Sequence, residues 1–266
     1  MMDKKSCFLC AWRATCQKRF SVTTDMSFNI FCPDYSRDVT IRESDIDKLI
    51  VEQQIEHWKK QKQPKYPYII TVSRETGSGG SAIARMLATD LGMDLMSGQI
   101  IQRVADKAKM NPKVIEYMDE KAISTFDSII NSFFSSRHIW PTEYFRHLSR
   151  VILTIGKHGN AIVVGRGAHL ILPRETTFRV RVIAPPEYRM QRLMTNYEYS
   201  EKEAKAYMKQ KDTDRLAYAK KYFHSDPTDL FQYDMVLNTE KIGTEGGANS
   251  VKMAFYDWQS KRQPVH

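Results

Sequence analysis

Apolar residues from Tyr68 onward fall into short continuous runs that are separated by longer stretches with helical spacing. Short apolar runs bounded by turn residues are typical of strands that are buried on both faces of a parallel sheet. This pattern predicts strands at Tyr68–Val72, Ala161–Val164, Phe178–Ala184 and Met235–Leu237. In the third of these runs, Arg179 and Arg181 alternate with apolar neighbours.

The stretches between the strands favour helices. Local signals mark two of their beginnings: Pro112 follows the capping residue Asn111, and Ser200 with Glu203 forms a capping-box pattern. Helices are predicted over Ser81–Leu91, Ser97–Ala108, Pro112–Phe134, Thr142–Lys157, Pro186–Asn196, Ser200–Phe223 and Ala248–Lys261. Strands that alternate with helices predict an α/β fold built on a doubly wound parallel sheet.

The beginning of the chain differs from the rest in its cysteine content. All four cysteines, Cys7, Cys10, Cys16 and Cys32, lie in the first 32 residues. In a cytosolic chain such a cluster indicates a metal site rather than a disulfide framework. Four thiolates complete a tetrahedral Zn²⁺ site or hold an iron–sulfur cluster, and reduced structural or redox-sensing cysteines are the alternative.

Composition leads to the remaining expectations. The net charge of +9 suits polyanionic partners, nucleoside polyphosphates among them, while a solvated basic surface is the plain alternative.

No run of apolar residues is long enough to span a membrane, and the N-terminus lacks the apolar segment of a secretory signal, so we expect a cytoplasmic protein. Nucleotides are the expected partners rather than nucleic acid, and the oligomeric state is left open.

These differences divide the chain into three parts. Residues 1–42 are predicted to form a Cys-rich metal-binding module, and residues 43–66 a charged amphipathic helix followed by a linker that contains prolines. Residues 67–266 carry the alternating strands and helices, and with them the chemistry considered next.

The first predicted strand leads into a glycine turn and then a helix, which is where phosphates bind in such sheets. The turn reads Arg74-Glu-Thr-Gly-Ser-Gly-Gly80, and its glycines let an anion approach the backbone N–H groups. The match to the Walker A pattern is incomplete, because Gly80 stands at the lysine position and Arg74 at the first glycine. The predicted phosphate-binding residues are Arg74, Gly77, Ser78, Gly79, Gly80 and Ser81, and a plain glycine turn is the alternative.

Several segments in order resemble the bacterial cytidylate-kinase-like family. Ile70–Ala84 is similar to that family's phosphate loop, and Val164–Ala168 is similar to its Gly-Arg-Gly segment. Further similarity covers Val180–Arg192, the Asp-x-x-Arg-x-x-Tyr lid pattern at Asp212–Tyr218, and Tyr233–Thr239. The resemblance extends over residues 67–242 and implies a P-loop NTPase-type sheet with a helical lid, in addition to the small N-terminal module.

The resemblance also implies an activity. It suggests an ATP-dependent nucleotide kinase that uses Mg²⁺ and transfers a phosphoryl group to a nucleoside monophosphate, cytidylate or a similar small acceptor. The missing lysine keeps a second hypothesis open: a non-catalytic nucleotide-binding regulator whose four cysteines sense metal or redox state.

An active kinase would need other cations in place of the lysine. The candidates are Arg74, Arg166, Arg189, Arg192 and Arg215, and the alternative for each is a surface charge. Among them, we expect Arg166, Arg192 and Arg215 to be the catalytic cations. Ser97, Arg166 and Asp212 are the predicted substrate-binding residues, although Ser97 also suits a helix cap and Asp212 an ion pair with Arg215 or a role with magnesium. The strand before Arg166 carries no acid, so the phosphates and water are expected to hold Mg²⁺.

Overall fold

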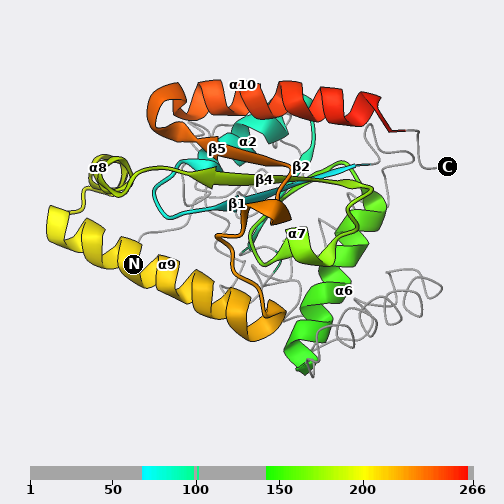
Figure 1. The fold of residues 1–266 in the computed structure, drawn as a ribbon, viewed down its shortest axis with the longest axis horizontal. Helices are drawn as coiled ribbons and strands as arrows, with labels where there is room; N and C mark the ends of the chain where they lie inside the picture. Colours follow the sequence, from blue (N-terminus) through cyan, green and yellow to red (C-terminus); the bar gives the residue numbers. More distant parts are fainter. Residues whose placement is uncertain (1–67, 99–100, 102–141, 263–266) are drawn as a thin grey trace, which may run out of the picture. The chain divides into compact units, whose positions relative to one another are not determined.

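The computed structural model of the chain describes residues 68–98, 101 and 142–262, and these contain a five-stranded parallel sheet (Figure 1). The strand order is β2-β3-β1-β4-β5. The strands are β1 (Ile69–Arg74), β2 (Asp94–Ser97), β3 (Ala161–Val164), β4 (Thr177–Ile183) and β5 (Met235–Asn238). The four cysteines and the helices predicted at residues 43–62 and Pro112–Phe134 lie outside the described ranges, and those predictions stay predictions.

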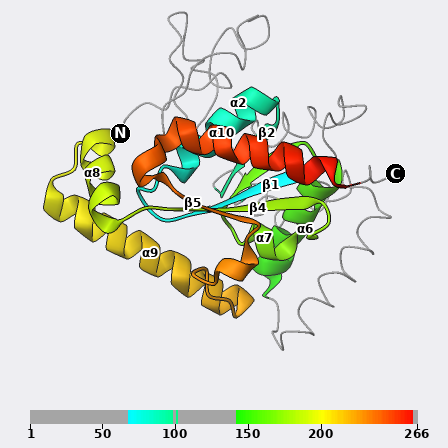
Figure 2. The same ribbon diagram turned by 45° about the horizontal axis from the view of Figure 1, so that its top comes forward.

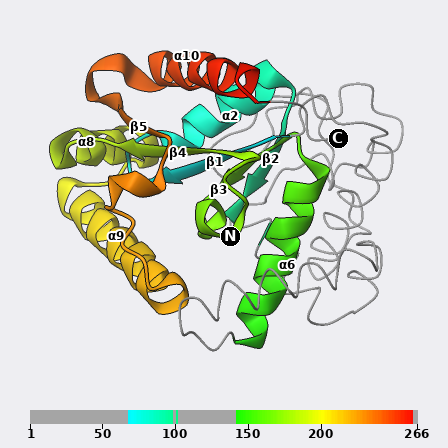
Figure 3. The ribbon, with the colours of Figure 1, turned by 45° about the vertical axis from the view of Figure 1, so that its right-hand side comes forward.

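Helices connect the strands and cover both faces of the sheet. They are α2 (Gly80–Leu91), α6 (Glu143–His158), α7 (Ala168–Ile171), α8 (Pro186–Tyr197), α9 (Glu201–Phe223) and α10 (Thr239–Ser260), with a 3₁₀ turn η2 at Leu230–Gln232. Helices α2 and α10 lie together on one face, and α6 and α7 lie on the other (Figures 2 and 3). The predicted doubly wound α/β sheet is therefore confirmed.

The apolar runs of β1 and β3 form strands because both sheet faces are covered. Ile69 and Ile70 are completely buried, and so are Ile162 and Val163 beside them. On the α2–α10 face, Phe178 packs against Phe255 and Trp258, with ring centroids 6.1 and 5.6 Å apart. This core fixes the sheet, and hence the positions of the loops that leave the carboxyl ends of its strands.

Helices α8 and α9 extend beyond the end of the sheet to which the β4 arrow points (Figure 1). Helix α9 begins with the predicted capping box: the Ser200 hydroxyl accepts from the Glu203 N–H, and the Glu203 carboxylate accepts from the Ser200 N–H. The helix has 23 residues, of which only Ala204 and Phe223 are buried. It thus forms the predicted lid, an arm beside the sheet rather than a layer of the core.

Two predicted boundaries differ from the structure. Ser97 ends β2, a strand that was not predicted, and pairs in parallel register with Val164. Helical conformation begins one residue later, at Gly98, so Ser97 directly precedes the helix, and most of the predicted helix Ser97–Ala108 lies outside the described ranges. The sequence of β2 contains no β-branched residue, so pairing with β3 overrides local propensity.

The last helix begins at Thr239 rather than at Ala248, and it contains a non-helical residue at Gly243. The residues before Ala248 were not predicted to be helical because they include several glycines, and glycine is unfavourable inside helices. At Gly247 the missing side chain allows close packing: a Cβ there would lie 2.8 Å from Leu237 Cδ2 and 2.9 Å from Ile83 Cδ1.

None of the helices within the described ranges combines the length and the apolar character needed to cross a lipid bilayer.

The packing of Phe223 on Gly167, in the turn after β3, can be tested by substitution, with Gly92 as the comparison. Gly167 has φ +68°, and a Cβ there would lie 2.2 Å from the Phe223 ring, whereas Gly92 has φ +65° and open space around it. Gly92→Ala carries only backbone strain and is expected to lower the free energy of unfolding by about 1 kcal/mol. Gly167→Ala adds the collision and is expected to lower it by about 3 kcal/mol, measured by urea unfolding. Equal losses for the two variants would contradict the close packing of Phe223 on Gly167.

Candidate phosphate-binding site

The turn between β1 and α2 has the backbone geometry of an anion site. Gly77 and Gly79 adopt φ of +81° and +85°, and α2 begins directly afterwards at Gly80. Within the described residues, no hydrogen-bond acceptor is found for the N–H groups of Gly77, Gly79, Gly80 and Ser81. Free N–H groups at a helix N-terminus, together with the helix dipole, favour a bound anion.

Contacts from three directions hold this turn in place. The Ser78 hydroxyl donates to the Glu75 carbonyl at 2.9 Å, so it serves the turn itself and not the space above it. The Thr239 hydroxyl donates to the Ser78 carbonyl at 2.7 Å, and the Glu75 carboxylate accepts from the Ala184 N–H at 3.2 Å. Ser78 and Thr239 are both completely buried, so the loop is preorganised by the ends of β4 and β5.

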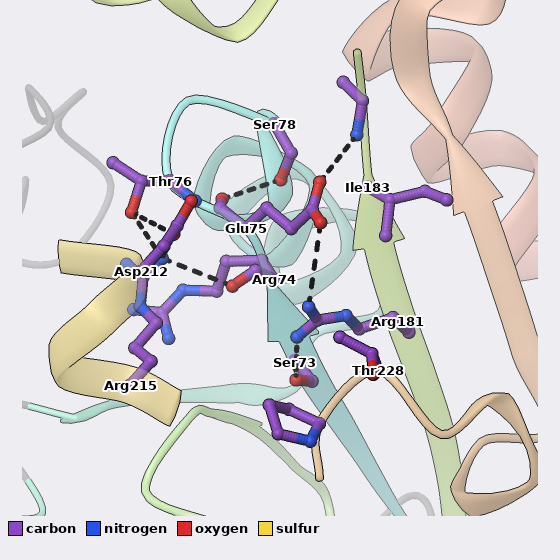
Figure 4. Close-up of polar contacts among 12 residues, drawn as sticks. Ser73, Arg74, Glu75, Thr76, Ser78, Arg181, Ile183, Asp212, Arg215 and Thr228 are labelled. Atoms are coloured by element: carbon purple, nitrogen blue, oxygen red, sulfur yellow. Dashed lines mark hydrogen bonds and ion pairs between the residues drawn. The ribbon is translucent and has the colours of Figure 1, made fainter. Parts of the chain in front are cut away.

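The carboxylate of Asp212, on α9, connects the lid to the loop (Figure 4). Its Oδ1 accepts from the Thr76 N–H at 3.0 Å and from the Thr76 hydroxyl at 2.8 Å. Its Oδ2 accepts from Arg189 Nη1 at 2.5 Å, and Arg215 Nη1 lies 3.2 Å from Oδ1. Burial opposes ionisation of Asp212, but the hydrogen bonds from Arg189 and Thr76 outweigh it and hold its pKa below the usual value.

Two arginines of the lid segment, Arg215 and Arg189, both donate hydrogen bonds to Thr76 in the loop. Arg215 Nη1 donates to the Thr76 hydroxyl at 2.6 Å and to the Arg74 carbonyl at 3.3 Å. Arg189, on α8, donates to the Thr76 carbonyl at 3.3 Å and lies 3.7 Å from the Glu75 carboxylate. Asp212 therefore orients Arg215, as one of the sequence hypotheses held, and it orients the buried Arg189 as well.

Four guanidiniums gather at the carboxyl ends of β1, β3 and β4. They belong to Arg74, Arg166, Arg181 and Arg215. Burial first, and then the charges of the other three, lower the pKa of Arg74 to about 9. Among the described residues, the buried Nε of Arg74 has no hydrogen-bond partner. Like charges held together in this way favour the binding of an anion.

Arg181 has the lowest exposed fraction of the four arginines in this cluster. Its exposed fraction is 7%, and its Nη1 donates to the Ser73 hydroxyl at 2.9 Å. Its Nη2 lies 3.9 Å from the Glu75 carboxylate (Figure 4). Arg189 Nε lies 3.7 Å from the same carboxylate. Arg181 was not predicted as a site residue, although a cation inside the apolar run of β4 was a visible signal.

Arg166 is held by an unusual stretch of backbone after β3. Gly165, Arg166 and Gly167 have consecutive φ values of +81°, +54° and +68°. A left-handed conformation is unfavourable for a residue with a Cβ, and such strain is concentrated at functional sites. The Arg166 Nε donates to the Gly98 carbonyl at 3.2 Å, and its guanidinium lies 5.7 Å from the centroid of the Tyr218 ring. Burial raises the pKa of Tyr218 well above its usual value.

Arg192 and Ser97 occupy separate places. Arg192 lies beside Gly79: its Nη2 is 3.3 Å from where a Cβ of Gly79 would be, and its guanidinium is 5.8 Å from the Tyr188 ring centroid. Ser97 lies at the carboxyl end of β2, one residue before the carbonyl that Arg166 binds. Their predicted roles in catalysis and in substrate binding stay predictions.

The described residues contain no group of three or more His, Cys, Asp or Glu side chains that could hold a metal ion. The two carboxylates at the loop, Glu75 and Asp212, already face arginines. The cysteines predicted to bind Zn²⁺ or an iron–sulfur cluster lie outside the described residues.

Comparison with known proteins confirms the family that the motifs indicate. The sequence profile of the cytidylate kinase-like family matches residues 69–241. The chain is 25% identical over 197 residues to a cytidylate kinase of Methanopyrus kandleri, an alignment that covers 74% of this chain and 97% of the relative. It is 25% identical over 191 residues to a cytidylate kinase of Pyrococcus horikoshii, covering 72% and 90%.

A solved structure shares the fold. The crystal structure of an uncharacterized protein from Eubacterium ventriosum superposes with a TM-score of 0.58 at 22% identity, covering 72% of this chain and 99% of that one.

The contact between Asp212 and the loop leads to a pH-dependent expectation. The pKa of Asp212 is lowered from its usual 3.8 on folding, so its stabilisation is complete above that value and is lost as the pH falls through the folded-state pKa. Asp212→Asn is expected to have a lower urea midpoint at about pH 7 and a smaller further loss between about pH 5 and about pH 2 than the unmodified protein. The matched control is Asp214→Asn, whose carboxylate only accepts from Gln210 on the exposed side of α9. Parallel acid profiles for the Asp212 variant and the unmodified protein would contradict the contact.

Proposed function

The chain belongs to the cytidylate kinase-like family, and we propose that it is an ATP-dependent nucleotide kinase whose acceptor is a nucleoside monophosphate, cytidylate or a similar small molecule. The observation that carries the proposal is the convergence of Arg74, Arg166, Arg181 and Arg215 beside a glycine turn with free N–H groups. An α/β sheet binds its ligands at this edge. The names of the two archaeal relatives support the same reaction class.

On the donor side, the triphosphate of ATP would lie on the N–H groups of Gly77, Gly79, Gly80 and Ser81. Arg192, whose Nη2 lies 3.3 Å from where a Cβ of Gly79 would be, would reach the same phosphates from α8. Magnesium would be held by phosphate oxygens and water, and Ser81, which is exposed at the start of α2, has a hydroxyl free to join them.

On the acceptor side, the strained turn after β3 would present Arg166 to the anionic group of the acceptor. The Tyr218 ring lies against this guanidinium and limits its movement. Ser97, at the end of the neighbouring strand β2, lies next to the residue that Arg166 binds. These residues make Arg166 and Ser97 the proposed contacts for a monophosphate.

The reaction itself requires little covalent chemistry from the protein. The bond between the γ-phosphorus and the oxygen bridging to the β-phosphate breaks, and an oxygen of the acceptor takes its place on the γ-phosphorus, leaving ADP. The protein contributes alignment and neutralisation of the charge on the transferred group. Arg215 would take on that task, and the support for this role is that Asp212 and Thr76 hold its guanidinium at the loop.

The alternative is a nucleotide-binding regulator that does not catalyse transfer. Gly80 is the observation in its favour, because the lysine that normally neutralises the β- and γ-phosphates is missing. The two functions differ in one measurable respect: both bind ATP, but only the kinase turns it over.

The direct test is phosphotransfer from ATP–Mg²⁺ to a panel of nucleoside monophosphates, followed by coupled detection of ADP. We expect turnover with at least one pyrimidine monophosphate. Arg166→Met and Arg215→Met are each expected to lower kcat/KM by about a hundred-fold or more, since each removes a cation from the developing charge. Arg174→Met, which replaces an exposed arginine at the opposite end of β4, is the matched control and should leave the rate unchanged.

Tight ATP binding without turnover on any acceptor would overturn the kinase proposal and favour the regulator. Turnover that survives both arginine replacements would show that the cluster is not the site of transfer.

A further inference from the structure

The two departures of this chain from the Walker A pattern lie next to each other in space. The pattern places a glycine at position 74 and a lysine at position 80, where this chain has Arg74 and Gly80. A Cβ added to Gly80 would lie 2.6 Å from Arg74 Cβ and 3.2 Å from Val182 Cβ. The first of these distances is far too short for two carbon atoms that both belong to the fixed first part of a side chain. A lysine at position 80 is therefore incompatible with an arginine at position 74.

The side chain of Arg74 begins where the lysine side chain would begin. It leaves the end of β1 beside Gly80 and reaches the turn after β3, where its Nη1 lies 2.6 Å from where a Cβ of Gly165 would be. Two glycines thus make room for one arginine, one at each end of its side chain. The path runs along the edge of the sheet, between the glycine turn and Arg166.

The charge of Arg74 is not neutralised by the residues around it. No carboxylate among the described residues forms an ion pair with it, and its buried Nε has no hydrogen-bond partner. Its charged neighbours are the other three arginines of the cluster. A guanidinium that only filled space would be expected to find an acceptor in the protein, because an unpaired buried cation is costly.

We propose that Arg74 supplies the cation that the Walker A lysine supplies in other P-loops, and that Gly80 is glycine because Arg74 occupies its space. In the Walker A pattern the cationic residue stands at the end of the loop, whereas here it stands at the beginning. Its ligand is the β- and γ-phosphate group of a nucleoside triphosphate. A guanidinium can engage two phosphate oxygens at once, which a lysine ammonium does only as a point charge. The inference deepens the proposed function and rests on it for the identity of the ligand.

A reciprocal exchange of the two residues tests this inference. The double variant Arg74→Gly/Gly80→Lys reads G-E-T-G-S-G-K-S over positions 74–81, which is the complete Walker A pattern. Gly80→Lys alone places a side chain against Arg74 and is expected to lower the melting temperature by several degrees, about 3 °C or more. The matched control is Gly246→Lys, because a Cβ at Gly246 meets nothing closer than 3.5 Å. The double variant is expected to recover most of the loss.

Nucleotide affinity provides the second readout, measured by calorimetry with ATP, ADP and adenosine on the full chain. Arg74→Met keeps the stem of the side chain and removes its charge. It is expected to weaken ATP binding by about ten- to a hundred-fold and to leave adenosine binding unchanged. Arg74→Lys should retain part of the affinity, and the double variant should return ATP affinity to within about ten-fold of the original. Arg174→Met is again the matched arginine control.

Other outcomes would contradict either this inference or the proposed function. Unchanged ATP affinity in Arg74→Met would overturn the inference, even if the single glycine variant fails to fold. A Gly80→Lys protein as stable as Gly246→Lys would overturn the steric argument, and so would a double variant less stable than either single variant. Phosphotransfer fully retained in Arg74→Met would refute the role of Arg74 but leave the kinase proposal intact. ATP binding that depends on Arg74, in a protein that transfers no phosphate, would refute the kinase proposal and support the role of Arg74.

Discussion

The carboxylate of Asp212 holds together two parts of the chain that are 136 residues apart in sequence. It binds the backbone and the hydroxyl of Thr76 in the loop and two arginines of the lid segment. Without this anion, Arg189 and Arg215 would repel each other and the nearby cations, because all of them carry the same charge. The Asp212 side chain thus fixes the position of the lid, which is mainly exposed helix, beside the buried sheet.

The site is otherwise an accumulation of positive charge at the end of a fully buried sheet. Six arginines approach the glycine turn, namely Arg74, Arg166, Arg181, Arg189, Arg192 and Arg215, and they face two carboxylates. Such an excess is tolerated because backbone hydrogen bonds and buried hydroxyls fix the loop independently of any ligand. The arrangement is electrostatic preorganisation, in which the protein arranges its dipoles and charges before the anion arrives.

The sequence was sufficient to predict the parallel sheet, the glycine turn, the lid helix with its capping box and the family. These features are recorded locally, in apolar runs, glycine spacing and the Ser200–Glu203 pair. It was not sufficient for β2, which is a strand only because β3 lies beside it, or for the early start of α10 at Thr239. Arg181 was missed as a site residue, and Arg189 was named only as one of five candidates to replace the charge of the lysine. The roles of both depend on Glu75 and Asp212, far away along the chain.

The hydrogen bond from Thr239 to the Ser78 carbonyl has a consequence for the order of events during synthesis. It joins residues 161 positions apart, and the other contacts that hold the loop also come from far along the chain, from Ala184 and Asp212. A ribosome makes the glycine turn early, but the hydroxyl that fixes it emerges only after β5 has been translated. The nascent chain therefore carries a loop that lacks one of its supports until β5 has been made. The complete set of contacts behind the loop is a property of the chain translated through β5, and not of its first βα unit.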